Sequence, residues 1–185
     1  MTISKYFFLF ILLNLSTCTG CKEKEWTTLP PETQTGANTF GCYIDGELFV
    51  KVHSLFGKIL TVNYNTESDK LYINLWGTVN GKDASGNINM VIDTPIEGST
   101  QKFSNAYYRS AQGTPYPPNQ DQSKPIQVCY IYGTNNSGTC TITKFDTIQK
   151  IVSGQFQFVG FCIDSTNTKK ITQGRFDLKM DINNY

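Results

Sequence analysis

Residues 39–52 read Thr-Phe-Gly-Cys-Tyr-Ile-Asp-Gly-Glu-Leu-Phe-Val-Lys-Val, and this stretch decides the fold. Apolar residues alternate on both sides of a central Asp-Gly pair: Phe40, Cys42 and Ile44 before Asp45-Gly46, and Leu48, Val50 and Val52 after it. Alternation with a period of two is typical of a strand with one buried face. Asp-Gly between two such runs predicts a β-hairpin with a type I′ turn, because both central residues of that turn need positive φ.

Further short alternating runs follow this hairpin, separated by Gly, Asn, Asp and Ser. They cover residues 59–64, 71–79, 88–92, 126–132, 140–145, 154–163 and 174–182. No longer window carries the helical spacing of apolar positions. The predicted fold class is therefore all-β, an antiparallel meander of about ten strands that forms a barrel or a two-sheet sandwich. Both architectures bury one face of every strand, so the choice between them stays open.

The last run shows the alternation most clearly. Phe176, Leu178, Met180 and Ile182 fall on one face, and Arg175, Asp177, Lys179 and Asp181 fall on the other. The pattern predicts a core face and a solvated face of alternating charge.

The N-terminal region reads as an export signal. Lys5 precedes an apolar run over residues 6–13, which is too short to span a bilayer, and a cluster of small residues with two cysteines follows it. A secretory signal that ends in cysteine resembles the bacterial lipobox, in which the new N-terminal cysteine receives a lipid. Cys21 is the preferred lipidation site and Cys18 the alternative, because cleavage before Cys21 leaves an even number of further cysteines.

These signals divide the chain into a lipoprotein signal peptide (1–20), a flexible tether (21–38) and one all-β domain (39–185). The tether is predicted from Pro30-Pro31 and the polar residues around them. Loss of residues 1–20 removes only Lys5, so the formal net charge falls from +1 to 0. A neutral chain without a basic stripe argues against nucleic acid as a partner. Membrane contact is expected through the covalent lipid.

Four cysteines lie in the predicted domain. Cys129 and Cys140 flank the segment 130–139, whose Asn-Asn-Ser-Gly centre suggests a hairpin tip, so this pair is a disulfide candidate. Cys42 and Cys162 form a second candidate bridge, or remain buried thiols that pack as small hydrophobes.

Three ordered segments carry a family resemblance: LPPETQTGANTFGCYIDGELF (29–49), TITKFDTIQKIVSGQFQF (141–158) and ITQGRFDLKM (171–180). Together they resemble an uncharacterised family of Bacteroidetes lipoproteins, with a Pro-Pro tether, a Thr-Phe-Gly-Cys hairpin and C-terminal Ser-Gly-x-Phe-x-Phe and Gly-x-Phe-Asp strands. The resemblance implies a lipid-anchored β-rich envelope protein, on either the periplasmic or the surface-exposed side of the outer membrane. It implies no catalytic residues.

No catalytic, metal or cofactor signature stands out in the chain. There is one histidine, His53, which excludes a His-rich metal site and offers a single centre for a triad. The Gly-rich stretch 81–86 lacks the Lys-Ser/Thr of a phosphate loop. We therefore expect no cofactor, no metal and no enzyme, although carboxylates brought together by folding could form a hydrolase pair.

Aromatic residues are the one hint of a ligand. Tyr72 and Trp76 lie on the face opposite the apolar residues of their strand, and Tyr107, Tyr108 and Arg109 precede a long polar stretch that contains Tyr116. Exposed aromatic rings beside an arginine and amides suit stacking on sugar rings or on a planar ligand. The alternative is that Tyr72 and Trp76 belong to the core.

Two function classes follow from these features. The first is a lipid-anchored binding or accessory module for a glycan, a small molecule or an envelope partner. The second is a structural or assembly protein of the envelope that acts through sheet-edge or surface contacts.

Overall fold

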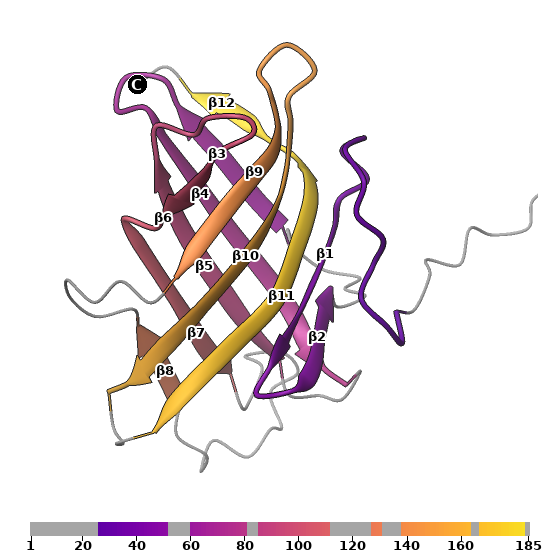
Figure 1. Cartoon of the computed structure of the whole chain (residues 1–185), viewed down its shortest axis with the longest axis vertical. Coiled ribbons are helices and arrows are strands. Elements are labelled where there is room, and N and C mark those ends of the chain that lie inside the picture. Colours follow the sequence, from indigo (N-terminus) through magenta and orange to yellow (C-terminus); the bar gives the residue numbers. More distant parts are fainter. Residues whose placement is uncertain are drawn as a thin grey trace, which may run out of the picture.

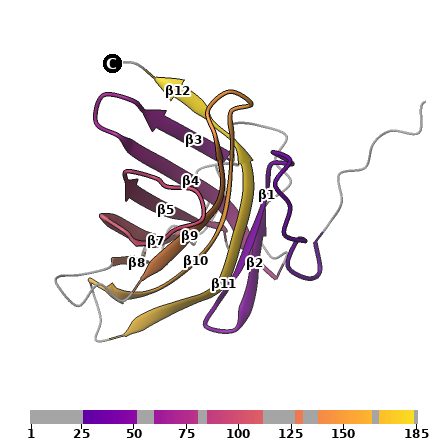
Figure 2. The ribbon, with the colours of Figure 1, turned by 45° about the horizontal axis from the view of Figure 1, so that its top comes forward.

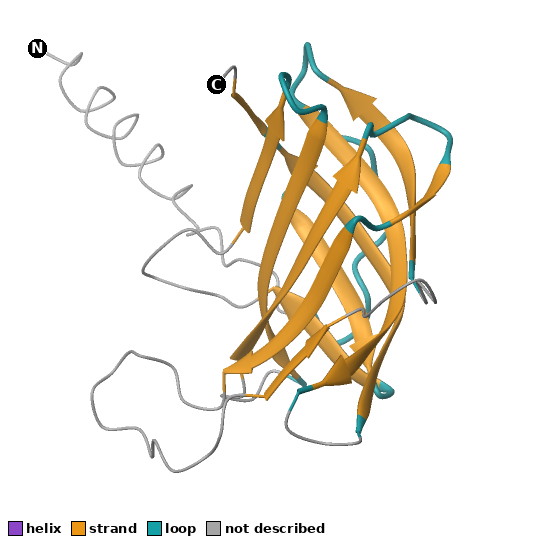
Figure 3. Ribbon diagram, turned by 90° about the vertical axis from the view of Figure 1, so that its left-hand side faces the viewer, coloured by secondary structure: helices purple, strands orange, loops and turns teal. Residues whose placement is uncertain are grey.

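The computed structural model describes residues 26–51, 60–80, 85–111, 127–130, 138–163 and 167–183. Within these ranges there are twelve strands and no helix (Figure 1; Figure 3). The strands are β1 (Thr39–Ile44), β2 (Glu47–Lys51), β3 (Leu60–Asn65), β4 (Lys70–Val79), β5 (Ser85–Asp93), β6 (Thr100–Lys102), β7 (Asn105–Ala111), β8 (Gln127–Tyr130), β9 (Thr139–Asp146), β10 (Ile151–Cys162), β11 (Thr168–Lys179) and β12 (Asp181–Asn183). The all-β prediction is confirmed.

Eight of the strands close into a barrel (Figure 2). Their order is β11-β1-β2-β4-β5-β7-β8-β10, and β10 returns to pair with β11. All eight pair antiparallel, whereas the short β12 pairs with β3 in parallel. The sheet thus forms a barrel, which settles the choice that periodicity leaves open.

The barrel interior is filled by apolar side chains from every wall. The predicted inward residues of β4 (Leu71, Ile73, Leu75) and β5 (Ile88, Met90, Ile92) are all buried in this core. Two free thiols, Cys42 and Cys140, are also buried there, and burial raises the pKa of both, that of Cys140 to about 12. No helix within the described ranges is long and apolar enough to cross a membrane.

The first hairpin has the predicted turn. Asp45 and Gly46 have φ of 52° and 85°, as a two-residue type I′ turn requires. This turn pairs Cys42 with Phe49 and Gly41 with Val50. Because directly opposed residues share a face, Phe49 enters the core, whereas Leu48 and Val50 point outward, contrary to the alternation in the sequence. Val52 lies outside the described residues.

β8 and β9 do not form the predicted hairpin with each other. Both pair with the same edge of β10, β8 at Phe161 and Cys162 and β9 at the opposite end of the strand. Cys129 lies opposite Cys162, and these two cysteines form the disulfide, with Cα atoms 3.8 Å apart. The predicted pairs Cys129–Cys140 and Cys42–Cys162 are therefore wrong, and Cys42 matches the alternative of a buried thiol.

Residues 26–38, which we call the strap, lie along the outer surface of the barrel beside β1 and β11 (Figure 1). A Cβ atom added to Gly41 would meet Pro30 Cδ at 2.7 Å and Val50 Cγ1 at 3.2 Å. The strap therefore covers Val50, an outward residue that is nevertheless buried. The predicted flexible tether is wrong for the described part of residues 21–38.

Asp177 holds the strap in place. Its carboxylate accepts hydrogen bonds from the backbone N–H groups of Thr35, Gly36 and Ala37 at 2.8–3.1 Å. It also accepts bonds from the hydroxyls of Thr33 (2.6 Å) and Ser153 (2.8 Å). Burial alone would raise the pKa of Asp177, but these hydrogen bonds outweigh it and lower the pKa to about 2. Asp177 is only 1% exposed, so the prediction that it lies on a solvated face is wrong.

Candidate functional site

The outer surface of β3, β4, β5 and β7 carries a continuous group of amide and aromatic side chains, which we call the amide–aromatic face. Alternation along each strand points these residues away from the apolar core. The face consists of Thr61 and Asn63 on β3, Tyr72, Asn74 and Trp76 on β4, Asn87 and Asn89 on β5, and Tyr107 and Arg109 on β7.

Strand register aligns these residues into rows that cross the strands. One row runs Thr61, Asn74, Asn89, Tyr107 and Tyr130, with one residue from each of β3, β4, β5, β7 and β8. Neighbouring strands are about 4.8 Å apart, so this row is about 19 Å long. A second row contains Trp76, Asn87 and Arg109. The rows place hydrogen-bonding groups and rings at regular intervals across the wall.

A shallow hollow lies at one end of the face. Its volume is about 350 Å³. It is lined by Thr61, Asn63, Asn65, Tyr72, Ile73, Asn74, Asn89 and Asn183. Tyr72 is 42% exposed and is one of the few large apolar side chains on the surface. A ring beside several carboxamides can contact the apolar face of a ligand while the amides bond its polar groups.

Asn87 is a buried polar residue in the middle of this face. It is only 5% exposed, although its position in β5 points outward. Its Nδ2 donates to Asn74 Oδ1 at 3.3 Å, whereas its Oδ1 has no hydrogen-bond partner within the described part of the chain. Buried polar atoms without a partner are rare and costly in folded proteins. The Asn87 amide therefore has an unused acceptor just beneath the surface of this face.

The far side of the face combines stacked rings with a positive charge. Tyr107 packs on Tyr130 with ring centroids 5.3 Å apart. Arg109, on the next outward position of β7, is exposed. At the other end of β4, Lys70 and Asp93 form an exposed ion pair with a separation of 2.9 Å. Charge on the face is thus close to balanced, with a single added cation at Arg109.

Folding brings four of the six predicted ligand residues together on this surface: Tyr72, Trp76, Tyr107 and Arg109. The competing prediction that Tyr72 and Trp76 are core is wrong, because Tyr72 is exposed and neither residue joins the core cluster. Tyr108 is excluded from the site, because it points into the barrel, where burial raises its pKa to about 12. Tyr116 lies outside the described residues.

The asparagines of the face were missed in the sequence. Asn63, Asn74, Asn87 and Asn89 alternate with the apolar residues of β3, β4 and β5, so their outward direction was readable. The sequence does not show that these four asparagines lie side by side, because their positions relative to one another depend on the register of the strands.

The remaining residues with predicted chemistry are the candidate metal ligands and the candidate lipidation sites. The described residues contain no group of three His, Cys, Asp or Glu side chains that could hold a metal ion. His53, Cys18 and Cys21 lie outside them. The chain matches no family model, no curated protein and no solved structure.

Proposed function

We propose that this chain is a lipid-anchored protein of the bacterial cell envelope whose barrel binds a glycan through the amide–aromatic face. The observation that carries the proposal is the row of amides and rings across β3, β4, β5 and β7, with the unpartnered Asn87 Oδ1 beside it. Anchoring rests on the N-terminal signal with Cys21, or Cys18, as the lipidated residue, and on the resemblance to Bacteroidetes lipoproteins.

Sugars fit this surface for chemical reasons. A pyranose ring has an apolar C–H face that packs on Tyr or Trp, and hydroxyls that both donate and accept hydrogen bonds. A carboxamide can bond a hydroxyl in either direction, because it has an NH₂ donor and a carbonyl acceptor. The longest row measures about 19 Å, so it favours an oligosaccharide that lies across the strands over a single sugar.

A glycan array probed with the full-length protein in detergent tests the proposal, followed by calorimetric titration of the best oligosaccharide. Tyr72→Ser and Tyr107→Ser should each weaken binding about 5-fold or more, because an aromatic contact contributes about 1 kcal/mol. Tyr43→Ser is the matched control, since Tyr43 is a half-buried outward tyrosine on β1, away from the face. An array without any bound glycan, or equal losses in all three variants, would contradict the assignment.

The length of the ligand gives a second readout. Affinity should rise from the monosaccharide to the tetrasaccharide and then level off, because the row offers a limited number of strand positions. A ligand held only in the hollow at Tyr72 would show no gain beyond a disaccharide.

Lipid anchoring has its own test. Metabolic labelling with a fatty-acid analogue should mark the wild-type chain and the Cys18→Ala variant but not Cys21→Ala. Label retained in Cys21→Ala and lost in Cys18→Ala would assign the lipid to Cys18. An unlabelled wild-type chain would refute the anchor.

An assembly role is the second candidate, and the two short outer strands favour it. Within the described residues, β6 pairs only with β9 and β12 only with β3, so each has one edge without a strand partner. Such edges can accept a strand from another chain. Light scattering of the purified protein tests this role, and a monomer at high concentration with no crosslinked partner in cells would count against it.

A further inference from the structure

A second polar groove lies beside the strap, on the outer surface of β9, β10 and β11. Its volume is about 290 Å³. Its lining contains three glutamines, two threonines, one arginine and one strap carboxylate: Gln155, Gln157, Gln173, Thr139, Thr141, Arg175 and Glu32. In strand order around the barrel, β10 and β11 are opposite β4 and β5. This groove is therefore separate from the amide–aromatic face.

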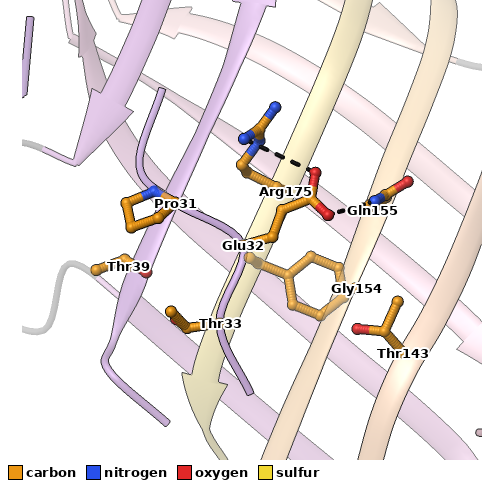
Figure 4. A pocket seen from close by; sticks show the side chains of 9 residues that line it. Pro31, Glu32, Thr33, Thr39, Thr143, Gly154, Gln155 and Arg175 are labelled. Carbon is orange, nitrogen blue, oxygen red and sulfur yellow. Dashed lines mark hydrogen bonds and ion pairs between the residues drawn. The ribbon is translucent and has the colours of Figure 1, made fainter. Parts of the chain in front are cut away.

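Glu32 lines this groove and also the small neighbouring pocket drawn in Figure 4, where its carboxylate faces Arg175 and Gln155. Its Oε2 accepts a hydrogen bond from Gln155 Nε2 at 2.8 Å, while its Oε1 is 3.7 Å from Arg175 Nη1. The Glu32 side chain is 54% exposed. An ion pair so long and so exposed contributes little to stability, so another carboxylate can replace it at small cost.

Not all hydrogen-bond donors of the Arg175 guanidinium have an acceptor in this arrangement. Its Nη1 donates to the carbonyl oxygen of Pro30 at 3.3 Å, and its Nε is buried with no acceptor among the described residues. A guanidinium binds a carboxylate best through two parallel N–H groups. The ion pair between Arg175 Nη1 and Glu32 Oε1 is 3.7 Å long, which is longer than a hydrogen bond, so Glu32 does not reach that geometry from the strap.

The far part of the groove presents amides from a distorted strand. Thr172 and Gln173 of β11 together lie opposite Gln157 of β10, which is a β-bulge, and Gln173 has φ of 52°. Bulges redirect side chains and are common beside binding sites. The side chains of Gln157 and Gln173 make no hydrogen bond to any described residue, and both are exposed. They are available to the polar groups of a ligand.

We propose that this groove binds a carboxylate-bearing ligand, whose carboxylate takes the place of Glu32 on Arg175 and Gln155. The hydroxyls of an acidic sugar would meet Gln157, Gln173 and the two threonines. The strap itself stays bound during this exchange, because Asp177 holds its backbone at Thr35, Gly36 and Ala37, beyond Glu32. Glu32 therefore acts as an internal competitor for the site.

Calorimetric titration of the full-length protein in detergent at low salt, with tri-galacturonate as the probe, tests the inference. Glu32→Gln should bind about 5-fold tighter than wild type, because it removes the competing charge while its amide oxygen still accepts from Gln155. Arg175→Gln should weaken binding at least 10-fold. Glu67→Gln is the control for net charge, since Glu67 is exposed in the turn between β3 and β4.

The outcomes separate this site from the amide–aromatic face. Tyr72→Ser should leave tri-galacturonate binding unchanged, and neutral maltotriose should not compete with it. Unchanged or weaker binding by Glu32→Gln would overturn the inference, as would absence of binding in every variant or equal binding of maltotriose. Improved affinity cannot come from unfolding, so the Glu32→Gln result stands even if Arg175→Gln is unstable.

Discussion

Two opposite walls of the barrel treat their outward polar residues differently. One wall consists of β10 and β11 beneath the strap, and we call it the strap wall. Its buried Asp177 accepts six hydrogen bonds, five from the strap and one from Ser153. On β4 and β5 the buried Asn87 keeps an acceptor without a partner among the described residues. Both walls are built from antiparallel strands.

The difference separates a buried polar residue whose hydrogen bonds are complete, Asp177, from one whose hydrogen bonds are incomplete, Asn87. The free-energy cost of removing a polar group from water is offset only when its hydrogen bonds to water are replaced by hydrogen bonds within the protein. On β11 the hydrogen bonds of the Asp177 carboxylate are replaced from within the chain, so this buried carboxylate stabilises the fold. On the amide–aromatic face the hydrogen bond of Asn87 Oδ1 is not replaced within the described residues, which agrees with the proposal that a ligand binds there.

The largest effect is expected from Asp177→Ala. It removes the acceptor of three backbone N–H groups and should lower the free energy of unfolding by roughly 3 to 5 kcal/mol. Asp93→Ala on the opposite wall is the matched control, and loss of its exposed ion pair with Lys70 should cost at most about 1 kcal/mol. Urea denaturation measures both. Equal losses would mean that the two walls do not differ in this way.

Removal of the disulfide should have the next largest effect. Within the described residues, β8 and β10 share only two residue pairs in register, so the Cys129–Cys162 bond is a main link between these two strands. A separation of 33 residues corresponds to about 3 to 4 kcal/mol of stability in the chain-entropy account. Reduction should lower the urea midpoint of wild type and leave the Cys129→Ser/Cys162→Ser variant unchanged.

Amide hydrogen exchange shows which strands lose stability when the Cys129–Cys162 disulfide is reduced. Protection should fall first in β7 and β8, beside the disulfide, while the ten pairs between β10 and β11 remain protected. Loss of protection that begins in the strap wall would contradict this order.

Acidification should weaken the strap wall selectively. The pKa of Asp177 is lower in the folded protein than in the unfolded chain, so its stabilisation is present above about pH 4 and is lost as the pH falls towards 2. The Asp177→Asn variant has no carboxyl group at this position that could titrate. The stability difference between wild type and Asp177→Asn should therefore shrink over that range, and curves that stay parallel would exclude Asp177 as the titrating group.

The smallest effect on stability is expected from Tyr72→Ser on the amide–aromatic face. Its side chain is exposed and lies outside the core cluster, so the free energy of unfolding should change by at most about 0.5 kcal/mol. Ser153→Ala, which removes one bond to Asp177, should cost about 1 kcal/mol. A larger loss in Tyr72→Ser would show that this face also holds the fold.

Local signals predicted much of the strand content correctly. The Asp45-Gly46 turn and the inward residues of β4, β5 and β11 follow from alternation and turn chemistry. The disulfide prediction is wrong because the true partners are distant in sequence. The sequence places Cys129 opposite Cys140 across a hairpin, but β8 and β9 both pair with the same edge of β10, where Cys129 lies opposite Cys162.

The candidate site shows the same division. The outward direction of Tyr72 and Trp76 was readable from their own strand, but the meeting of these residues with Tyr107 and Arg109 needs the register between β4, β5 and β7. Tyr108 illustrates the limit, since one step along β7 moves a side chain from the face to the core.

By itself, the sequence determined the fold class, the chemistry available on each strand and the two residues of the first turn. These depend on interactions between neighbours in the chain, which periodicity records. Only the tertiary structure decided the closure of the barrel, the Cys129–Cys162 bond, the burial of Asp177 beneath the strap and the assembly of the amide–aromatic face. Each of these joins segments far apart in sequence, and their pairing is selected by the packing and hydrogen bonding of the whole sheet.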